Sequence, residues 1–481
     1  MAAHFGMIGL GTMGSNFVLN VAEHSFEVCG YDRDPKQQQR LIAEARGKKV
    51  TTAPSLAEFV RALETPRIIM LLVPAGKIVD AVIADLLPLV QKGDILIDGG
   101  NSHFIDTERR YNELQGSGIH FVGMGVSGGE EGARYGPSMM PGGNRESYER
   151  IKNILEAVAA KTEEGPCVSF IGNSAAGHYT KMVHNGIEYA IMQLISEVYG
   201  LLKTAGQLSN DELHNVFKEW DQTELQSFLI EITADIFLKK DDDTRNDLVD
   251  MVLDKAKQKG TGMWTSQSAM ELNVPLPIID AAVSMRYISS QKELREKNAR
   301  LYSLPGNKGS IAKKELIALC KNALHFGFLL SYAQGLELLS VASAKYNYGI
   351  DVAEVVRVWK GGCIIRSVLL NDLRKAYLQD KSLSNIASSA LFRETLGKSH
   401  ESVRQLLEIA MARHIPATAL SAALNYFYAL VNARLPANLI QAQRDYFGAH
   451  TYERTDKPGV FHSQWENKPP VAVSAQKPKE D

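Results

Sequence analysis

The sequence predicts an α/β domain with a mostly parallel sheet, followed by a large all-helical domain and a C-terminal tail. Three observations lead to this prediction: a strand that runs into a glycine-rich loop at the N-terminus, strand-like and helical runs that alternate up to about residue 175, and helical sequence beyond it. A chain of 481 residues has room for two or three domains. The expected boundaries are 1–175 for the α/β domain, 176–433 for the helical domain and 434–481 for the tail.

The glycine-rich loop at the N-terminus is the strongest local motif. A short apolar strand leads into Gly9, Gly11 and Gly14, a helical stretch follows, and a second strand ends at Asp32. Gly9 permits a tight turn, Gly11 lets the backbone approach a pyrophosphate at the helix N-terminus, and Gly14 allows the helix and strand to pack closely. An acidic residue at the position of Asp32 meets the ribose of a dinucleotide. The pattern therefore predicts a dinucleotide-binding domain of the Rossmann type.

Later apolar runs are expected to complete the sheet, at residues 67–73, 94–98, 119–122 and 167–171. Glycine-rich polar motifs stand where strands are expected to end, at residues 98–102, 123–133 and 141–143. Ligands of open α/β sheets bind outside the carboxyl ends of the strands. Each motif alone could be a structural turn, but the three together favour a binding site.

One predicted helix, over residues 177–195, carries a polar face on an apolar body. Lys181, His184, Asn185 and Glu188 occupy positions i, i+3, i+4 and i+7, which share one face. A lysine and a carboxylate on one rigid face supply the base and the acid that proton transfer requires. The alternative is a solvated surface face with an i,i+4 network.

Composition and charge narrow the class of protein. A net charge of −2 indicates no surface for nucleic acid or membrane. The longest apolar runs, such as 68–73, are too short to cross a bilayer, and the first strand begins too early for a signal peptide. Cys29, Cys167, Cys320 and Cys363 lack metal spacing, so we expect free thiols, a cytoplasmic protein and no metal site.

The helical part contains a weak internal repeat. Residues 196–200 followed by Trp220 resemble residues 331–335 followed by Trp359, which would fit an old duplication. Near the C-terminus the chain turns to Pro, Lys and Ser, which predicts an extended tail with a disordered end.

Six motifs spread over nearly the whole chain match one family. They are residues 9–14, 97–102, 125–138, 181–189, 258–262 and 435–452. With these motifs the chain resembles the decarboxylating 6-phosphogluconate dehydrogenases. The Ser-Gly-Gly and lysine motifs also occur in the wider β-hydroxyacid dehydrogenases, whereas the last two motifs are specific to the decarboxylating enzymes.

The resemblance implies a base and an acid. Unprotonated Lys181 would remove the proton of the substrate 3-hydroxyl as hydride leaves C3 for the nicotinamide. The β-keto acid that results would lose CO2 without a metal, and Glu188 would donate a proton to C1 to give ribulose 5-phosphate. This chemistry requires a lysine of lowered pKa and a carboxyl group able to stay protonated.

Substrate contacts follow from the same resemblance. The carboxylate and hydroxyls of 6-phosphogluconate would meet Asn101, Ser127, Gly128, Gly129, His184 and Asn185. Its phosphate would meet Tyr189, Lys259, Thr261 and Arg286. Arg444 and His450 would complete the neighbouring subunit's site, so a homodimer with crossing tails is expected.

The resemblance also implies NADP as the cofactor. It would contact Gly9, Leu10, Gly11, Thr12, Met13, Gly14, Asp32, Arg33, Asp34, Val73 and Asn101. NADP-dependent members usually carry Asn-Arg-Thr where this chain has Asp32-Arg33-Asp34, and often a lysine where it has Pro74. Because carboxylates repel a 2′-phosphate and suit a free ribose hydroxyl, NAD use is also expected.

Two alternatives stay open at this point. A β-hydroxyacid dehydrogenase for a smaller acid would not need Lys259, Thr261, Arg444 or His450, and its helical domain would be about half as long. An idle dinucleotide-binding sensor should have lost the lysine or the glutamate of the polar helix face, and both are present.

Overall fold

The protein is described from a computed structural model, which covers residues 2–302, 304 and 311–465. The chain divides into two compact units, Met1–Leu424 and Asn425–Asp481. The predicted disordered end of the tail lies outside the described residues.

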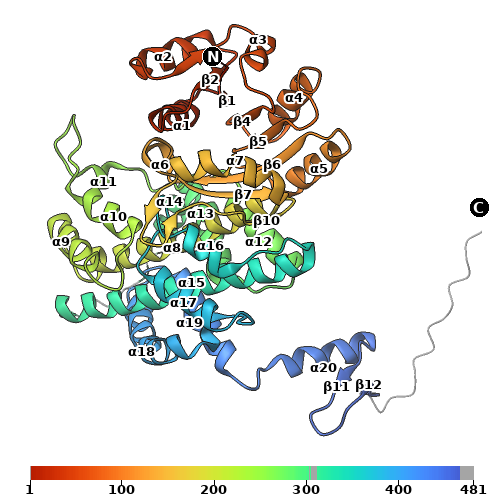
Figure 1. Cartoon of the computed structure of the whole chain (residues 1–481). Coiled ribbons are helices and arrows are strands. Elements are labelled where there is room, and N and C mark those ends of the chain that lie inside the picture. The colour runs from red at the N-terminus through yellow and green to blue at the C-terminus, as the bar shows by residue number, and fades with distance from the viewer. Residues whose placement is uncertain (1, 303, 305–310, 466–481) are drawn as a thin grey trace, which may run out of the picture. The chain divides into compact units, whose positions relative to one another are not determined.

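A twisted sheet forms the α/β part of the first unit (Figure 1). Its strands are β1 (Phe5–Ile8), β2 (Val28–Tyr31), β3 (Val50–Thr52), β4 (Ile68–Leu71), β5 (Ile95–Asp98), β6 (His120–Ser127), β7 (Ser138–Gly143) and β10 (Gly172–Asn173). They lie in the order β10-β7-β6-β5-β4-β1-β2-β3, and β6 pairs antiparallel to β7 while the other pairs are parallel. The chain order reverses between β1 and β4, where ligands of such sheets bind.

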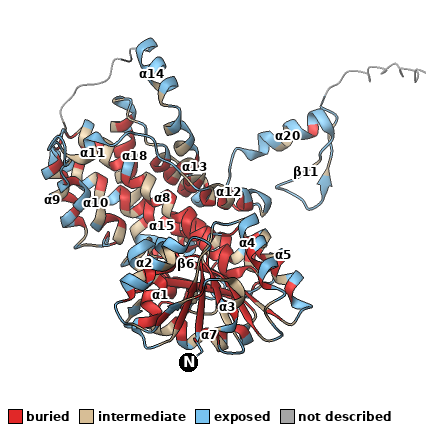
Figure 2. Ribbon diagram, turned by 90° about the horizontal axis from the view of Figure 1, so that it is seen from above, coloured by how far each residue is buried: buried red, intermediate tan, exposed pale blue. Residues whose placement is uncertain are grey.

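Helices cover both faces of the sheet, because its central strands are apolar on both sides. One hydrophobic core lies under α1 (Thr12–Glu23), α2 (Pro35–Ala45) and α7 (Arg145–Val158). The other lies under α3 (Leu56–Arg61), α4 (Lys77–Leu86) and α5 (Phe104–Gln115). Figure 2 shows the buried strands between partly exposed helices. The predicted doubly wound α/β fold is confirmed.

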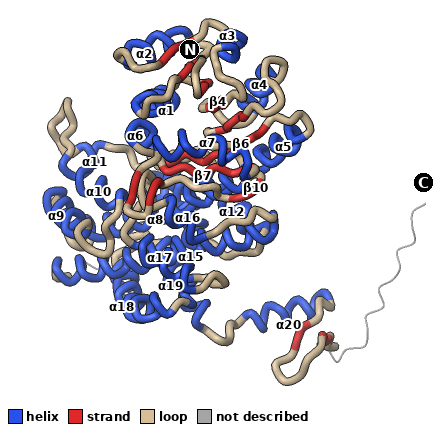
Figure 3. Tube along the Cα trace, in the orientation of Figure 1, coloured by secondary structure: helices blue, strands red, loops and turns tan. Residues whose placement is uncertain are grey.

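The remainder of the first unit is mostly helical (Figure 3). Two long helices, α8 (Ala176–Thr204) and α15 (Lys313–Tyr346), pack against each other. The other helices of this unit are α6 (Gly129–Tyr135), α9 (Asn210–Trp220), α10 (Phe228–Leu238), α11 (Leu248–Met251), α12 (Thr261–Glu271), α13 (Pro277–Ser290), α14 (Lys292–Leu301), α16 (Val352–Val358), α17 (Leu369–Gln379), η1 (Ile386–Ser388) and α18 (Ala390–Ala412). Helix α19 (Thr418–Val431) begins in this unit and ends in the second. A short hairpin joins β8 (Lys161–Thr162) to β9 (Gly165–Pro166). The predicted helical domain is confirmed.

Helix α15 is long and apolar enough to cross a membrane by length and composition, which the prediction from apolar runs overlooked. However, 72% of its most apolar window is buried inside the protein. A helix that is apolar all round is also typical of the centre of a large helical core. Together with its packing against α8 and α18, this burial identifies α15 as a core helix.

One predicted strand and one predicted strand end need correction. Residues 167–171 contribute one isolated bridge, Met139 to Val168, and the edge strand β10 begins only at Gly172. The motif 141–143 lies inside β7 rather than after a parallel strand. Because β7 is antiparallel, its carboxyl end lies at the opposite edge of the sheet from the binding site.

Gly142 of this motif serves helix packing instead. A Cβ on Gly142 would lie 2.5 Å from the backbone nitrogen of Gly177, and a Cβ on Gly177 would lie 2.2 Å from the carbonyl oxygen of Met140. The N-terminal turn of α8 therefore rests directly on the backbone of β7. This close approach fixes the start of the helix that carries Lys181.

The second unit has its own small framework of α20 (Ala437–Gly448), β11 (Tyr452–Glu453) and β12 (Val460–Phe461). Its centre is the buried carboxylate of Asp445, which accepts hydrogen bonds from the Thr451 amide, the Ser463 amide and the Trp465 indole, and contacts the ring of His462. A carboxylate with this many donors organises the turn and hairpin that follow α20.

Candidate active site

A cavity of about 590 Å³ opens at the carboxyl ends of β1, β2 and β4, the point where the strand order reverses. Its walls are mostly apolar, with charged groups at one end. The lining residues are Ile8, Gly9, Gly11, Tyr31, Asp32, Arg33, Asp34, Gln37, Leu56, Leu72, Val73, Pro74, Ile78, Val82 and Asp85. A cleft of this kind at a switch point suits a dinucleotide.

The three loop glycines occupy three different environments. Gly9 has φ of 94°, in the left-handed region, and a Cβ there would lie 2.4 Å from the Leu72 carbonyl oxygen. A Cβ on Gly14 would lie 1.9 Å from the Gly9 carbonyl oxygen, so that glycine is needed for packing. A Cβ on Gly11 would meet no atom within 4 Å, so this backbone is open to a ligand at the N-terminus of α1.

The charged end of the cavity is more constrained than the sequence indicates. The Asp32 carboxylate accepts hydrogen bonds from the Leu10 amide at 2.7 Å and the Asp34 amide at 2.9 Å. Asp34 caps α2 by accepting from the Lys36 amide. Arg33 is exposed and pairs with Asp85 at 2.8 Å. Nothing in the sequence indicates that Asp85, on α4, belongs to this site, because only the fold brings it to the cavity.

Not every predicted cofactor residue faces the cavity. Leu10 is fully buried and contributes its backbone amide to Asp32, and Gly14 is a packing residue. Thr12 and Met13 form the first turn of α1 beside Gly11. Asn101 is exposed in the loop after β5.

The polar face of α8 is largely buried against β6 and α12. Lys181 and Asn185 are 7% and 8% exposed, and His184 is fully buried. Lys181 Nζ lies 3.4 Å from His184 Nδ1, and His184 Nδ1 lies 3.9 Å from the Glu188 carboxylate. The predicted face is thus one continuous cluster, and it is not the solvated surface stripe of the alternative interpretation.

A neutral histidine accounts for these contacts in a single tautomer. His184 Nδ1 lies 3.0 Å from Asn185 Oδ1, to which it can donate, and His184 Nε2 lies 3.1 Å from the Ser127 hydroxyl, which can donate to it. In this tautomer Nδ1 carries a hydrogen, so the Lys181 amine cannot donate to it across the 3.4 Å contact. The tautomer is assigned from the hydrogen-bond partners.

Burial shifts the pKa values of Lys181 and Glu188 in this cluster in opposite directions. Burial lowers the pKa of Lys181, although the Glu188 carboxylate acts against the shift. Burial raises the pKa of Glu188, although Lys181 and Arg286 act against that shift. Burial and the nearby Lys181 hold the pKa of His184 well below its ordinary value. The arrangement favours a neutral amine, a neutral imidazole and a protonated carboxyl, which are the forms that a base and an acid require.

The loop after β6 brings Ser127, Gly128 and Gly129 to this cluster. Ser127 is buried and contacts His184, and Gly128 adopts φ of 113°. A Cβ on Gly128 would lie 2.5 Å from the Gly362 carbonyl oxygen, which shows how closely residues far along the chain pack behind the loop. Trp359 also stands edge-on to the His184 ring, with centroids 5.7 Å apart. The sequence analysis named Trp359 only as part of a possible repeat, and it did not connect the Trp359–Gly362 segment with the site.

The predicted phosphate residues lie on α8, on α13, and at or just before the start of α12. Asn185 Nδ2 donates to the Thr261 hydroxyl at 3.2 Å, which joins the Thr261 turn to the polar face. The Arg286 guanidinium lies 4.5 Å from the centre of the Tyr189 ring. Lys259 is exposed just before α12, whose N-terminus follows Gly260 in the left-handed conformation. A cation and a helix N-terminus at one place suit an anion.

Arg444 and His450 belong to the second unit and are described there alone. Arg444 is exposed on α20 and hydrogen-bonds Gln441, and His450 is exposed just after α20. Among the described residues there is no group of three or more His, Cys, Asp or Glu side chains that could hold a metal ion.

Comparison with known families gives two matches that together span most of the chain. The NAD binding domain of 6-phosphogluconate dehydrogenase matches residues 4–172. The 6-phosphogluconate dehydrogenase C-terminal domain matches residues 177–465.

Individual relatives agree with these matches. The NADP(+)-dependent, decarboxylating 6-phosphogluconate dehydrogenase of Bacillus subtilis is 52% identical over 461 residues, covering 96% of this chain and 98% of the relative. The decarboxylating 6-phosphogluconate dehydrogenase of Escherichia coli is 47% identical over 461 residues, covering 96% and 98%. The Plasmodium falciparum 6-phosphogluconate dehydrogenase, solved with its cofactor NADP+ and with its substrate 6-phosphogluconate, aligns with a TM-score of 0.93 at 41% identity over 96% of this chain and 100% of that chain.

Proposed function

Because the chain belongs to the 6-phosphogluconate dehydrogenase family, we propose how its own residues perform that family's reaction. The reaction is the oxidative decarboxylation of 6-phospho-D-gluconate to D-ribulose 5-phosphate and CO2 in the pentose phosphate pathway, with NADP+ as cofactor. One observation supports the assignment of roles most strongly: Lys181 and Glu188 share one buried helix face, and burial shifts their pKa values in opposite directions.

Lys181 acts as the base. When bound, NADP+ supplies the acceptor for the hydride that leaves C3. The neutral amine of Lys181 takes the proton of the 3-hydroxyl, so that the oxygen becomes a carbonyl as the hydride departs. The protonated amine then hydrogen-bonds this oxygen and stabilises the negative charge that develops there as CO2 is lost.

Glu188 acts as the acid. Loss of CO2 from the β-keto acid, with the proton on Lys181 passing to the C3 oxygen, leaves an enediol. The enediol becomes ribulose 5-phosphate when its terminal carbon, C1 of the product, gains a proton and Lys181 takes back the proton of the hydroxyl that becomes the carbonyl. Burial keeps the Glu188 carboxyl protonated to a higher pH than in water, so it can donate the proton that C1 gains. One turn of helix separates Glu188 from His184, which places the acid further along the same face as the base.

The remaining contacts hold the sugar acid. Asn101, Ser127, Gly128, Gly129, His184 and Asn185 bind its carboxylate and hydroxyls, whereas Tyr189, Lys259, Thr261 and Arg286 bind its phosphate. Two observations support this division: Ser127, His184, Asn185 and Thr261 form one hydrogen-bonded chain beside Lys181, and the cations Lys259 and Arg286 lie beyond it toward Glu188 and α12.

The residues of the cavity fit NADP+. The open backbone at Gly11 leaves room for the pyrophosphate at the N-terminus of α1. Arg33 stands at the charged end, where it can meet the 2′-phosphate. Two backbone amides already neutralise part of the Asp32 charge, which lessens its repulsion of that phosphate. Use of NAD+ stays a prediction.

We further propose that the enzyme is a cytoplasmic homodimer whose Arg444 and His450 complete the neighbouring subunit's phosphate site. The exposed Arg444 on α20 is available for an anion outside its own unit. All four cysteines are free and buried, which agrees with a reducing compartment.

The test is an assay of the purified full chain on 6-phosphogluconate, with NADP+ and NAD+ in parallel and ribulose 5-phosphate and CO2 measured as products. We expect stoichiometric formation of both products with NADP+. Turnover of a small β-hydroxy acid in place of 6-phosphogluconate would refute the substrate. NADP+ binding without turnover of either would support the sensor alternative.

A further inference from the structure

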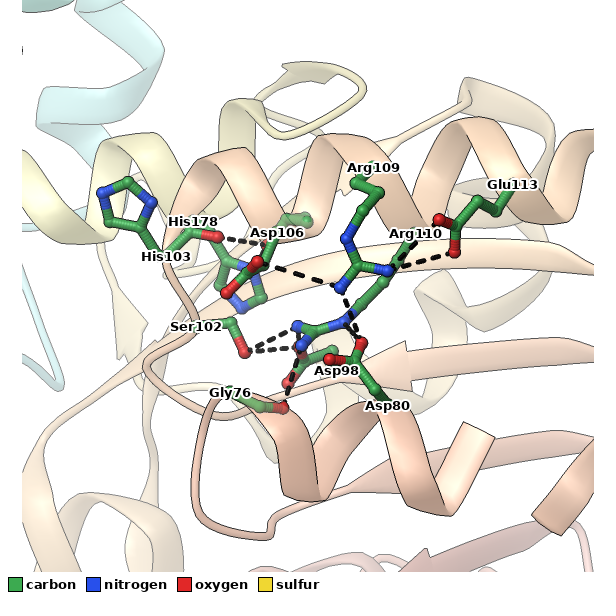
Figure 4. Close-up of polar contacts among 11 residues, drawn as sticks. Gly76, Asp80, Asp98, Ser102, His103, Asp106, Arg109, Arg110, Glu113 and His178 are labelled. Carbon is green, nitrogen blue, oxygen red and sulfur yellow. Dashed lines mark hydrogen bonds and ion pairs between the residues drawn. The ribbon is translucent and has the colours of Figure 1, made fainter. Parts of the chain in front are cut away.

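Arg110, on α5, is a fully buried arginine outside the set of residues assigned above (Figure 4). Its guanidinium donates to Asp80 at 2.7 Å, to the Gly76 carbonyl oxygen at 3.0 Å, and to both Asp98 and Ser102 at 3.3 Å. The Arg110 and Asp98 side chains are 2% and 1% exposed. A charge this deeply buried is tolerated only where its hydrogen bonds are made.

The hydrogen-bond partners of Arg110 lie at the ends of two loops of the site. Gly76 ends the loop between β4 and α4, in which Leu72, Val73 and Pro74 line the cofactor cavity. Asp98 and Ser102 enclose the loop after β5, which carries Asn101. One planar guanidinium thus contacts a cofactor loop and a substrate loop together, which its fork of donors allows.

The loop that carries Asn101 is held on both sides. One oxygen of the Asp98 carboxylate accepts from the Gly100 amide at 3.1 Å, and the other accepts from the Ser102 hydroxyl at 2.6 Å. Arg110 binds the second oxygen and the Ser102 hydroxyl together. The exposed side chain of Asn101 therefore projects from a backbone whose two neighbours are both fixed.

The same helix also contacts the catalytic helix. One turn before Arg110, the Thr107 hydroxyl lies 2.7 Å from Nδ1 of the buried His178, on α8. His178 stands three residues before Lys181. Helix α5 therefore joins three parts of the site: the loop with Val73, the loop with Asn101, and the helix with Lys181.

We propose that Arg110 is a positioning residue for hydride transfer, which sets the cofactor loop and the Asn101 loop in register with α8. The proposal rests on the proposed function and deepens it. Hydride transfer requires the reacting atoms to approach to about 3–3.5 Å, and a displacement of about 1 Å can slow such a step about 100-fold. A residue that fixes both loops at once controls this approach without touching the substrate.

Arg109 offers a matched control next to it. Arg109 also contacts Asp80, and it pairs with Asp106 and Glu113, but it lies on the exposed side of α5 at 43% side-chain exposure (Figure 4). Arg110→Lys and Arg109→Lys each keep the positive charge. Only the first removes the fork that joins Gly76, Asp98 and Ser102.

The experiment compares both variants with the wild-type chain in three measurements. Hydrogen exchange of the protein without ligand measures the amide exchange rates of loops 72–77 and 99–103. Calorimetry reports NADP+ binding. Steady-state kinetics, with 6-phosphogluconate carrying hydrogen or deuterium at C3, report kcat and the isotope effect.

For Arg110→Lys we expect faster exchange in both loops, weaker NADP+ binding, kcat lowered about 10- to 100-fold and a larger isotope effect, because hydride transfer becomes slower relative to the other steps. Arg109→Lys should match the wild type. A purely structural role would lower the melting temperature but leave the isotope effect and the loop exchange of the folded protein unchanged, and that result would overturn the proposal.

Ser102→Ala keeps the proposal testable if Arg110→Lys fails to fold. It removes one contact of the guanidinium and the hydrogen bond from Ser102 to Asp98, so we expect faster exchange in loop 99–103 with loop 72–77 unchanged, and a smaller rise in the isotope effect. Wild-type-like exchange and isotope effect in Ser102→Ala would refute the role of the network. An inactive wild-type chain would instead refute the proposed function, whereas an active one with indistinguishable arginine variants would refute only the role of Arg110.

Discussion

Replacing Lys181 by methionine tests the proposed base directly. Methionine has nearly the length of lysine and no ionisable group, so it fills the same buried space. The Lys181 side chain packs closely against Gly125, since a Cβ added to Gly125 would lie 2.4 Å from it. The substitution removes the lone pair that takes the proton of the 3-hydroxyl. It leaves the cofactor cavity, formed by other elements, unchanged.

The expected loss follows from the chemistry of the site. A general base usually contributes about 10²- to 10⁴-fold, which corresponds to about 3–5 kcal/mol of transition-state stabilisation. Because burial lowers the pKa of Lys181, the neutral amine predominates to a lower pH than in water, and kcat/KM should fall as the pH drops through that lowered pKa. As the pKa of Glu188 is raised by burial, activity should also fall at high pH, where the carboxyl ionises.

The assay follows NADPH formation across pH for the wild type, Lys181→Met and Glu188→Gln. Lys181→Met should show about 10²- to 10⁴-fold less hydride transfer with NADP+ binding intact, and Glu188→Gln should lose the high-pH limb. Near-normal turnover of Lys181→Met would refute the reasoning.

Stability provides an independent check on Lys181→Met. The folded wild type binds fewer protons than the unfolded chain between the lowered pKa of Lys181 and its ordinary value of 10.5, so its stability rises with pH across that window. Below the lowered pKa, the cost of a buried ammonium is complete. Lys181→Met should therefore gain stability over the wild type as the pH falls.

Three further predictions concern the tail, the cofactor and the catalytic helix. Arg444→Ala should raise the KM for 6-phosphogluconate, and subunit exchange with inactive Lys181→Met should restore activity, because one mixed site has both residues intact; no recovery despite verified exchange would exclude a shared site. Asp85→Asn should free its arginine partner and lower the KM for NADP+ up to about fivefold, with the KM for NAD+ unchanged as the control, since exposed ion pairs contribute about 0–1 kcal/mol. On α8, Gly200→Ala should raise the unfolding free energy by about 1 kcal/mol, because the added Cβ meets open space. Gly186→Ala should lower the unfolding free energy, because its added Cβ would lie 2.6 Å from a threonine side chain. Equal melting temperatures of the two variants would contradict both predictions.

Much of the site was accessible from the sequence because its key residues are local. The spacing of Lys181, His184, Asn185 and Glu188 is a property of one helix, so periodicity alone places them on a common face. The glycine loop is recognisable locally as well, because the positive φ at Gly9 favours glycine whatever packs around it. The fold class followed from the same kind of information, since alternating strands and helices can form only a few layer arrangements.

The tertiary structure decided what depends on contacts between distant segments. It placed residues 141–143 inside an antiparallel strand, where Gly142 admits Gly177 rather than a ligand. Periodicity puts a lysine and a carboxylate on one face, but only burial by β6, α12 and α15 shifts their pKa values, because desolvation depends on every element that excludes water. The same holds for Arg110 and Asp85: the sequence shows each as an ordinary charged residue of a helix, and packing alone determines that one holds two loops of the site while the other pairs with the arginine of the cofactor cavity.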